Sequence, residues 1–210
     1  MFRPPSPLTK RLIETPKTSG QQAVEGEKKG ADVTGELAIR RASKEDAQSV
    51  SEIYNWYVLN STVSFETAAV EISEMKRRIM EKLASHDWLV AEVNQQVVGY
   101  AYYGSFRPRA AYGHTVESTI YLSPNSAGKG FGRTLYSALV RSARERGFRE
   151  LVGVIALPNP ASVALHSALG FREVGVVYAV RRKFGKYVDV ALWQRSIEST
   201  RVWTNTFAVL

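Results

Sequence analysis

The sequence contains no cysteine in its 210 residues. This absence excludes disulfide bonds, thiolate nucleophiles and cysteine-ligated metal sites. The three histidines, His86, His114 and His166, lie far apart without the spacing of a zinc site, so we expect no bound metal. No apolar run approaches the ~18 residues of a membrane span and no signal-peptide core follows Met1, so we expect a cytoplasmic protein without a membrane partner.

The formal net charge is +8, from 28 lysine and arginine residues against 20 aspartate and glutamate residues. A basic chain of this kind can bind nucleic acid or a phosphorylated cofactor. Its basic residues are dispersed apart from the run Arg181, Arg182, Lys183, and none alternates with aromatic residues as in a single-strand platform. We therefore expect a solvated basic surface and no nucleic-acid partner.

The composition indicates one globular domain with extensions at both ends. Apolar residues make up 44% of the chain and charged residues 23%, which is ordinary for a globular protein. The first 36 residues differ, because four prolines fall there among polar residues without apolar periodicity. We expect residues 1–36 to be a disordered extension, 37–199 the folded domain and 200–210 a loose tail.

Hydrophobic periodicity predicts an α+β fold. Strands are expected over residues 37–41, 88–93, 97–103, 115–122, 151–156, 172–180 and 187–194, and residues 62–65 are short and β-prone. Helical spacing follows Ser43 and recurs over 72–84, 132–146 and 160–169. The apolar run 151–156 follows a helix, so it indicates a buried strand parallel to the one that precedes that helix.

The strand over 115–122 leads through a loop with Gly128, Gly130 and Gly132 into a helix. Such a junction presents free backbone N–H groups at the positive end of the helix dipole, which suits a phosphate group. The spacing is neither the dinucleotide fingerprint nor a P-loop. On the loop alone, a phosphate site and a flexible turn are both open.

Glu117 lies inside this strand, on the face opposite Val116 and Ser118. A carboxylate in a half-buried strand must be paired, solvated by a cleft, or functional. The preceding loop holds Arg107, Arg109 and Tyr112. These are either surface residues or a mouth that receives an anion next to Glu117.

These features together resemble the GNAT superfamily of acetyl-CoA-dependent N-acetyltransferases. The motif residues are Gly128–Arg133 after a strand, Asn159, and Leu169–Phe171. A closer resemblance, to the phosphinothricin N-acetyltransferase-like branch, is carried by Ser61–Phe65, Trp88–Val93, Glu117–Pro124, His166–Phe171 and Asp189–Gln194. The resemblance covers about residues 38–196.

The resemblance implies a GNAT-like three-layer fold, with a mixed central sheet, helices on both faces and two splayed parallel strands. The pantetheine arm of acetyl-CoA would lie between the strands over 116–122 and 151–156 and pair with main-chain groups there. The implied cofactor-binding residues are Ile120, Tyr121 and Leu122 on the strand, Gly128, Lys129, Gly130, Phe131, Gly132 and Arg133 around the diphosphate, and Asn159 near the thioester.

The chemistry of amine acetylation gives two residues candidate catalytic roles. Glu117 is the expected general base, with a pKa raised by desolvation, and His166 is the expected proton donor to the coenzyme A thiolate. The alternatives are that Glu117 pairs with Arg107 or Arg109 and only orders the loop, and that His166 is a packed, hydrogen-bonded helix residue.

The expected acceptor is a small amine that also carries a carboxylate or related anion. The residues expected to bind it are Phe65, Arg107, Arg109, Tyr112 and Glu117. Small amino acids or analogues such as phosphinothricin, methionine sulfoximine or methionine sulfone fit this description. The alternatives are a peptide N-terminal acetyltransferase and a non-catalytic basic module that binds nucleic acid or senses coenzyme A.

Three positions depart from the common pattern of the family. Ala127 stands where Arg or Gln is frequent, which removes one diphosphate contact. His166 stands where the superfamily often has Tyr, although His is familiar in this branch. His114 replaces the Trp of the herbicide-inactivating enzymes, which counts against phosphinothricin itself as the acceptor. Enzymes of this branch are usually dimers, so the resemblance implies a homodimer.

Overall fold

The structure is a computed structural model that describes residues 35–198, so the expectations for residues 1–34 and 199–210 lie outside it. Within this range the strands are β1 (Leu37–Arg41), β2 (Trp88–Val93), β3 (Gln96–Ser105), β4 (Thr115–Leu122), β5 (Glu150–Ala156), β6 (Arg172–Lys183) and β7 (Lys186–Ser196). The helices are α1 (Ala47–Asn60), α2 (Ile72–Ser85), α3 (Phe131–Glu145) and α4 (Pro160–Ala168). None of the helices in the described range is long and apolar enough to cross a membrane.

The strands form one mixed sheet in the order β1-β2-β3-β4-β5-β7-β6. β4 and β5 run parallel, and the other neighbouring strands pair antiparallel. The parallel pair is joined through α3, as the apolar run of β5 predicted. The expected mixed sheet with a parallel central pair is confirmed.

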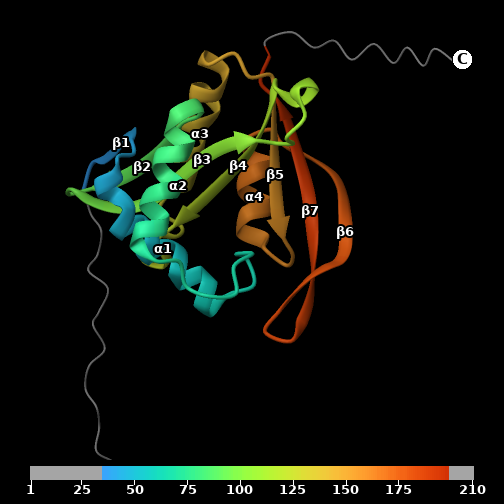
Figure 1. Ribbon diagram of the computed structural model, residues 1–210, viewed down its shortest axis with the longest axis horizontal. Coiled ribbons are helices and arrows are strands. Elements are labelled where there is room, and N and C mark those ends of the chain that lie inside the picture. The colour runs from blue at the N-terminus through green and yellow to red at the C-terminus, as the bar shows by residue number, and fades with distance from the viewer. Residues whose placement is uncertain (1–34, 199–210) are drawn as a thin grey trace, which may run out of the picture. The chain divides into compact units, whose positions relative to one another are not determined.

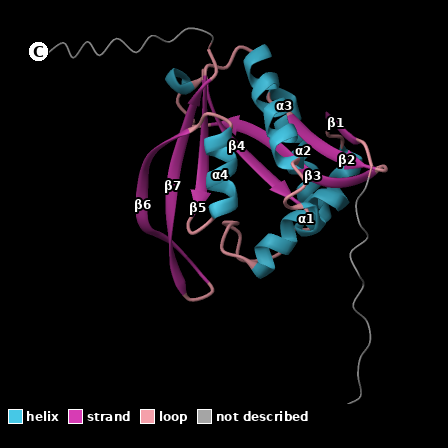
Figure 2. Ribbon diagram, turned by 180° about the vertical axis from the view of Figure 1, so that it is seen from behind, coloured by secondary structure: helices cyan, strands magenta, loops and turns pink. Residues whose placement is uncertain are grey.

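Helices cover both faces of this sheet, which gives the three layers expected from the sequence (Figure 1). On one face α1 and α2 bury apolar residues against β2 and β3, among them Val50, Met75, Ile79, Val90 and Tyr100. On the other face, seen from behind in Figure 2, α3 and α4 pack on the central strands with Leu135, Leu139, Leu151 and Ile155 buried. Burial of these two apolar faces is the main stabilising contribution.

A capping box between Ser43 and Asp46 leads into α1. The backbone N–H of Ser43 donates to Asp46 Oδ2 at 2.7 Å. Arg40 of β1 donates to the other oxygen of Asp46 at 2.7 Å. The carboxylate therefore ties the first strand to a short 3₁₀ turn, Lys44–Asp46, that leads directly into α1.

Two segments differ from the sequence expectation. Thr62–Phe65 forms bends rather than a strand. The last two strands are longer than predicted, because β6 extends to Lys183 and β7 begins at Lys186. The two differences have a common physical cause in the β6–β7 hairpin.

β6 contains an irregularity between Val177 and Arg181, where three β6 residues face one residue of β7. Ala179 in this bulge has a φ of +50°, and its N–H donates to the Asp189 carboxylate at 2.7 Å. A bulge increases local twist and redirects the side chains that follow it. The residues after it, Arg181 and Lys183, reach the loop between α1 and α2.

Two cations of β6 hold that loop by its carbonyl oxygens. Arg181 donates to the carbonyls of Ser64, at 2.7 Å, and of Thr62. Lys183 donates to Ser64 Oγ at 3.0 Å and to its carbonyl oxygen at 3.3 Å. Ser64 is fully buried and Lys183 is only 4% exposed. These hydrogen bonds replace the strand pairing that the β-prone residues would otherwise need.

We predict that Lys183→Met destabilises the protein by about 1–3 kcal/mol, because it removes two hydrogen bonds to buried atoms of Ser64 and leaves Arg181 to donate to the Ser64 carbonyl. Urea unfolding measures the free energy of unfolding. Lys186→Met, at an exposed position on the same hairpin, serves as the control and should change it by less than about 0.5 kcal/mol. Equal free energies of unfolding for the two variants would show that the hydrogen bonds from Lys183 to Ser64 do not stabilise the protein.

Candidate functional site

The parallel pairing of β4 with β5 stops partway along both strands. It covers four residue pairs and ends with Ser118 opposite Gly153. Beyond this point β4 stays paired with β3 to Leu122, and β5 stays paired with β7 to Ala156. Because each strand follows a different neighbour, the two diverge (Figure 1). We call this divergence, between residues 119–122 and 154–156, the splay.

The main-chain groups of Ile120 and Leu122 face the splay. Ser123 donates its N–H to the Val98 carbonyl of β3 at 2.8 Å, which makes that pair a hydrogen-bonded one. Successive residues of an antiparallel ladder direct their N–H and C=O groups to opposite sides. The N–H and C=O groups of Ile120 and Leu122 therefore point away from β3 and toward the splay. An extended ligand in the splay can pair with them as an added strand.

Helix α1 covers the β4 side of the splay. The ring of Tyr121 makes an edge-to-face contact with Tyr54, with 5.2 Å between centroids, and lies 5.1 Å from Tyr57. The Tyr57 hydroxyl donates to the Leu122 carbonyl at 2.8 Å. Tyr121 thus directs its ring to α1 and its main chain to β3. It differs in this from Ile120 and Leu122, the other two strand residues that were predicted to bind the cofactor.

The three glycines after β4 have two different physical roles. Gly128 and Gly130 have φ values of +77° and +80°, and a Cβ at either would point into open space. A Cβ on Gly132 would lie 3.1 Å from Leu122, so that glycine lets α3 approach β4 closely. The loop therefore leaves the N-terminal amides of α3 accessible to an anion.

The other predicted cofactor residues lie on the glycine loop, at the start of α3 and at the start of α4. Lys129 and Arg133 are exposed on the loop and the first turn of α3 and add positive charge there, and Phe131 begins the helix. Asn159 caps α4, with its Oδ1 accepting from the Ser162 N–H at 3.1 Å. This cap uses the oxygen of the Asn159 side chain and leaves its Nδ2 as the group that can donate to a ligand.

Three buried polar side chains meet at the closed end of the splay. The Tyr136 hydroxyl lies 2.7 Å from Ser118 Oγ and 3.0 Å from His166 Nε2. The imidazole rests on β5, because a Cβ on Gly153 would lie 2.5 Å from Nε2. Glycine at this position is therefore what admits the ring. Sequence reasoning missed Tyr136, which has the spacing of an ordinary core residue of α3.

The hydrogen bonds of His166 define its tautomer. Its Nδ1 lies 2.8 Å from the Ser162 carbonyl oxygen, which can only accept, so Nδ1 carries the hydrogen. Nε2 then accepts from Tyr136 while the ring is neutral. Burial lowers the pKa of His166, and the Ser162 hydrogen bond opposes that shift less strongly. Both ring nitrogens are engaged, so a proton exchanged with the splay passes through Tyr136.

Glu117 lies half-buried on the opposite face of β4, toward α2. Burial raises its pKa, and the charges of Arg107 and Lys82 oppose that shift. In the described part of the chain, no cation lies within the 4.0 Å ion-pair distance of its carboxylate. Glu117 is thus desolvated without being neutralised, which is the state that a general base requires.

The predicted acceptor residues of the β3–β4 loop lie near this carboxylate to different degrees. Arg107 influences Glu117 electrostatically, and its guanidinium carbon is 4.9 Å from the centroid of Phe106. Tyr112 contacts the edge of the same Phe106 ring. Arg109 is exposed beside them.

Phe65 does not join that group. It lies in the α1–α2 loop, where the Arg181 guanidinium sits 4.2 Å from its ring centroid. Both views place the α1–α2 loop and the β3–β4 loop at opposite ends of β4 (Figures 1 and 2). The predicted walls of one acceptor pocket are therefore separated by the length of the strand.

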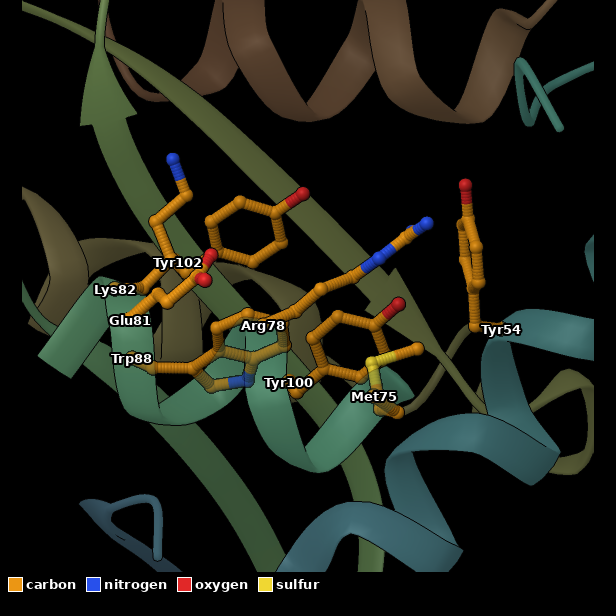
Figure 3. Close-up of a pocket in the computed structure, with 8 residues that line it drawn as sticks. All are labelled: Tyr54, Met75, Arg78, Glu81, Lys82, Trp88, Tyr100 and Tyr102. Carbon is orange, nitrogen blue, oxygen red and sulfur yellow. The ribbon is translucent and has the colours of Figure 1, made fainter. Parts of the chain in front are cut away.

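A cavity of about 100 Å³ lies between α2 and the sheet, and sequence reasoning missed it (Figure 3). Its lining residues are Tyr54, Met75, Arg78, Glu81, Lys82, Trp88, Tyr100 and Tyr102. The available signal was the apolar stripe of α2, where Arg78 and Lys82 occupy positions that face the sheet.

In the described range, no group of three or more His, Cys, Asp or Glu side chains could hold a metal ion.

Comparison with known proteins gives a consistent result. The family described as acetyltransferase (GNAT) domain matches residues 39–192. The phosphinothricin N-acetyltransferase of Streptomyces viridochromogenes is 42% identical over 162 residues, which cover 77% of this chain and 88% of that protein. The L-methionine sulfoximine/L-methionine sulfone acetyltransferase of Salmonella typhimurium is 34% identical over 163 residues, which cover 77% and 95%.

A solved structure shares the fold. The GNAT superfamily phosphinothricin acetyltransferase from Sinorhizobium meliloti, in complex with AcCoA, has a TM-score of 0.74 at 39% identity. The match covers 76% of this chain and 88% of that one. The α+β architecture expected from the resemblance is confirmed.

We predict that His166 titrates below its ordinary pKa of 6.5, because burial disfavours the charged ring. Tyr136→Phe removes the donor that stabilises the neutral ring, so it should raise the pKa of His166. NMR titration of the histidine C2 protons measures both effects, with Tyr178→Phe at an exposed position as the control. A pKa at or above 6.5, or no response to Tyr136→Phe, would contradict this arrangement.

Proposed function

This chain belongs to the GNAT family of acetyltransferases, and from that membership we propose that it acetylates the primary amine of a small amino acid or amino-acid analogue, with acetyl-CoA as donor. The observation that carries the proposal is the desolvated Glu117 carboxylate beside the closed end of the splay. The acceptor class follows the relatives, which are a phosphinothricin N-acetyltransferase and an L-methionine sulfoximine/L-methionine sulfone acetyltransferase.

The residues around the splay fit acetyl-CoA, which supplies the acetyl group as a thioester when bound. Ile120 and Leu122 offer main-chain groups to an extended arm. The open loop at Gly128 and Gly130 lets the amides from Gly128 to Gly132 approach a diphosphate, whereas the Arg133 N–H donates to the Gly130 carbonyl at 3.1 Å and Arg133 contributes its side-chain charge. We assign the Nδ2 of Asn159 to the arm near the thioester.

Glu117 acts in this proposal as the general base. An ammonium group has no lone pair, so Glu117 removes one proton from the acceptor, directly or through one water. The nitrogen then forms the bond to the acetyl carbon, and the carbon–sulfur bond breaks. The Ile120 N–H faces the splay and can donate to the carbonyl oxygen on which negative charge develops.

We assign His166 the proton supply for the departing thiolate, acting through Tyr136. The neutral ring takes up the second proton that the acceptor nitrogen loses, at Nε2 and by way of the Tyr136 hydroxyl, and returns it to the thiolate by the same path. Three observations support this assignment: the 3.0 Å contact between His166 Nε2 and the Tyr136 hydroxyl, the 2.7 Å contact from that hydroxyl to Ser118, and the position of Ser118 at the closed end of the splay. A thiolate is a tolerable leaving group, so His166 matters less than Glu117.

We also propose a homodimer in the cytoplasm. The β6–β7 hairpin exposes a series of large apolar side chains at the edge of the sheet, and an exposed apolar edge of this kind commonly marks an interface. They are Val174, Val177, Tyr178, Val180, Phe184 and Tyr187. The resemblance to dimeric enzymes supports the same assembly.

We predict that Glu117→Gln lowers kcat/KM by about 10²–10⁴, because it removes the base but keeps the shape of the side chain. Coenzyme A release from acetyl-CoA with methionine sulfone as acceptor measures the rate, and acetyl-CoA affinity should not change. Glu145→Gln, at an exposed position on α3, is the matched control. An unchanged rate in Glu117→Gln would exclude Glu117 as the base.

The pH profile supplies an independent readout of the same residue. The base must be ionised, so kcat/KM should fall as the pH decreases through the pKa of Glu117. Because burial raises that pKa, the acidic limb should lie above the ordinary value of 4.5. No coenzyme A release with any amine would favour a non-catalytic module, and release with peptides alone would favour a peptide N-terminal acetyltransferase.

A further inference from the structure

The ammonium group of Lys82 lies beside Glu117 across the β3–β4 ladder. Lys82 Nζ rests against the backbone of Gly104, where a Cβ would collide with it. Gly104 is the direct cross-strand partner of Glu117. Directly opposed residues in such a ladder have Cα atoms about 4.5–5.5 Å apart, with side chains on the same face. Helix α2 thus places the Lys82 ammonium group on the same face of the sheet as the Glu117 side chain.

The two opposite charges face each other without closing an ion pair. In the part of the chain that the structure describes, neither Lys82 nor Glu117 has an ion-pair partner within 4.0 Å. The nearby arginine of α2, Arg78, is instead held by Glu66 at 2.9 Å and Glu74 at 2.7 Å. Lys82 lines the cavity between α2 and the sheet, and Glu117 is the cross-strand partner of the glycine against which the Lys82 ammonium lies.

An α-amino acid carries an ammonium and a carboxylate on the same carbon atom, so one molecule presents both charges at short range. We propose that Lys82 binds the α-carboxylate of the acceptor while Glu117 receives the proton from its ammonium group. This inference rests on the proposed function and narrows its substrate class to free α-amino acids. Lys82 is a substrate-binding residue in this account, whereas Glu117 is the base.

The cavity next to Lys82 indicates which side chains fit. Its floor consists of stacked rings, with 4.2 Å between the centroids of Trp88 and Tyr102. Figure 3 shows Lys82 at one side of these rings, Tyr54 at the other, and the Arg78 guanidinium extending between them. The cavity has a volume of about 100 Å³.

This lining selects a short side chain with an apolar stem. The stem can lie on the aromatic floor, and an oxygen at its tip can accept from Arg78, whose Nη2 is not used in the pairs with Glu66 and Glu74. A peptide amino terminus lacks the carboxylate on the same carbon, so it would leave Lys82 unpaired. Free amino acids with a short oxygenated side chain are therefore the acceptors that can contact Lys82, Arg78 and the aromatic rings of the cavity together.

The test compares two acceptors that differ only in the carboxylate, L-methionine sulfone and 3-(methylsulfonyl)propylamine. The wild-type protein should show a higher kcat/KM for the amino acid. In Lys82→Met this preference should fall by about 10- to 100-fold, mainly through KM of the amino acid, because one charge-assisted hydrogen bond is lost. The kcat/KM for the amine should change less than that for the amino acid, because the amine has no carboxylate for Lys82 to bind.

Two further variants make the result specific to the position of the charge. Lys76→Met removes a lysine from the exposed face of the same helix and should leave the preference unchanged. Gly104→Ala keeps the lysine but places a methyl group where its ammonium rests, so it should reduce the preference in the same direction. The end of a lysine side chain moves easily, so this change should leave the fold intact.

The outcomes separate this inference from the proposed function. Equal preference in Lys82→Met and wild type overturns the role of Lys82, and so does a wild type that uses both acceptors equally well, although acetyl transfer then stands. If no acceptor releases coenzyme A, the proposed function fails. The role of Lys82 is then tested by calorimetric binding of methionine sulfone in the presence of coenzyme A. Binding that Lys82→Met weakens at least tenfold supports the carboxylate site, whereas equal or absent binding overturns it.

Discussion

The structure depends on one interruption of hydrogen bonding, the end of the β4–β5 ladder at Ser118 and Gly153. Both strands keep their antiparallel neighbours, so the sheet stays continuous while the main-chain groups of Ile120 and Leu122 face no strand. The Leu122 carbonyl already accepts from the Tyr57 hydroxyl, and a ligand arm can pair with the other main-chain groups that face the splay, the N–H of Leu122 and the N–H and carbonyl of Ile120. The buried chain from Ser118 through Tyr136 to His166 lies where the interruption begins.

Strand geometry gives β4 separate surfaces for two substrates. Its alternating side chains place Glu117 and Tyr121 toward α1 and α2, whereas Ser118 faces α3. The main-chain groups at the splay point in a third direction, toward β5. In the proposed reaction the acetyl donor lies along the main chain and the acceptor lies across the side chains. Two substrates can therefore reach the same strand without competing for one pocket.

Local patterns were sufficient for most of the fold and for part of the site. Apolar periodicity located the helices and strands because burial imposes it, and the glycine loop and Glu117 stand out within a few residues of sequence. The bends at Thr62–Phe65 could not be predicted, because Arg181 and Lys183 bind that loop from 117 and 119 residues away. Lys82 escaped notice for a similar reason, since its significance depends on Gly104 of another element.

Residue-resolved hydrogen exchange tests the central claim most directly, because the splay predicts an alternating response along β4. Adding saturating acetyl-CoA should slow exchange at the amides of Ile120 and Leu122 by about tenfold or more. The amides of Thr119 and Tyr121 face β3 and should change little. Unchanged exchange at Ile120 and Leu122 with acetyl-CoA bound would contradict the account, because the donor would then lie somewhere other than between β4 and β5.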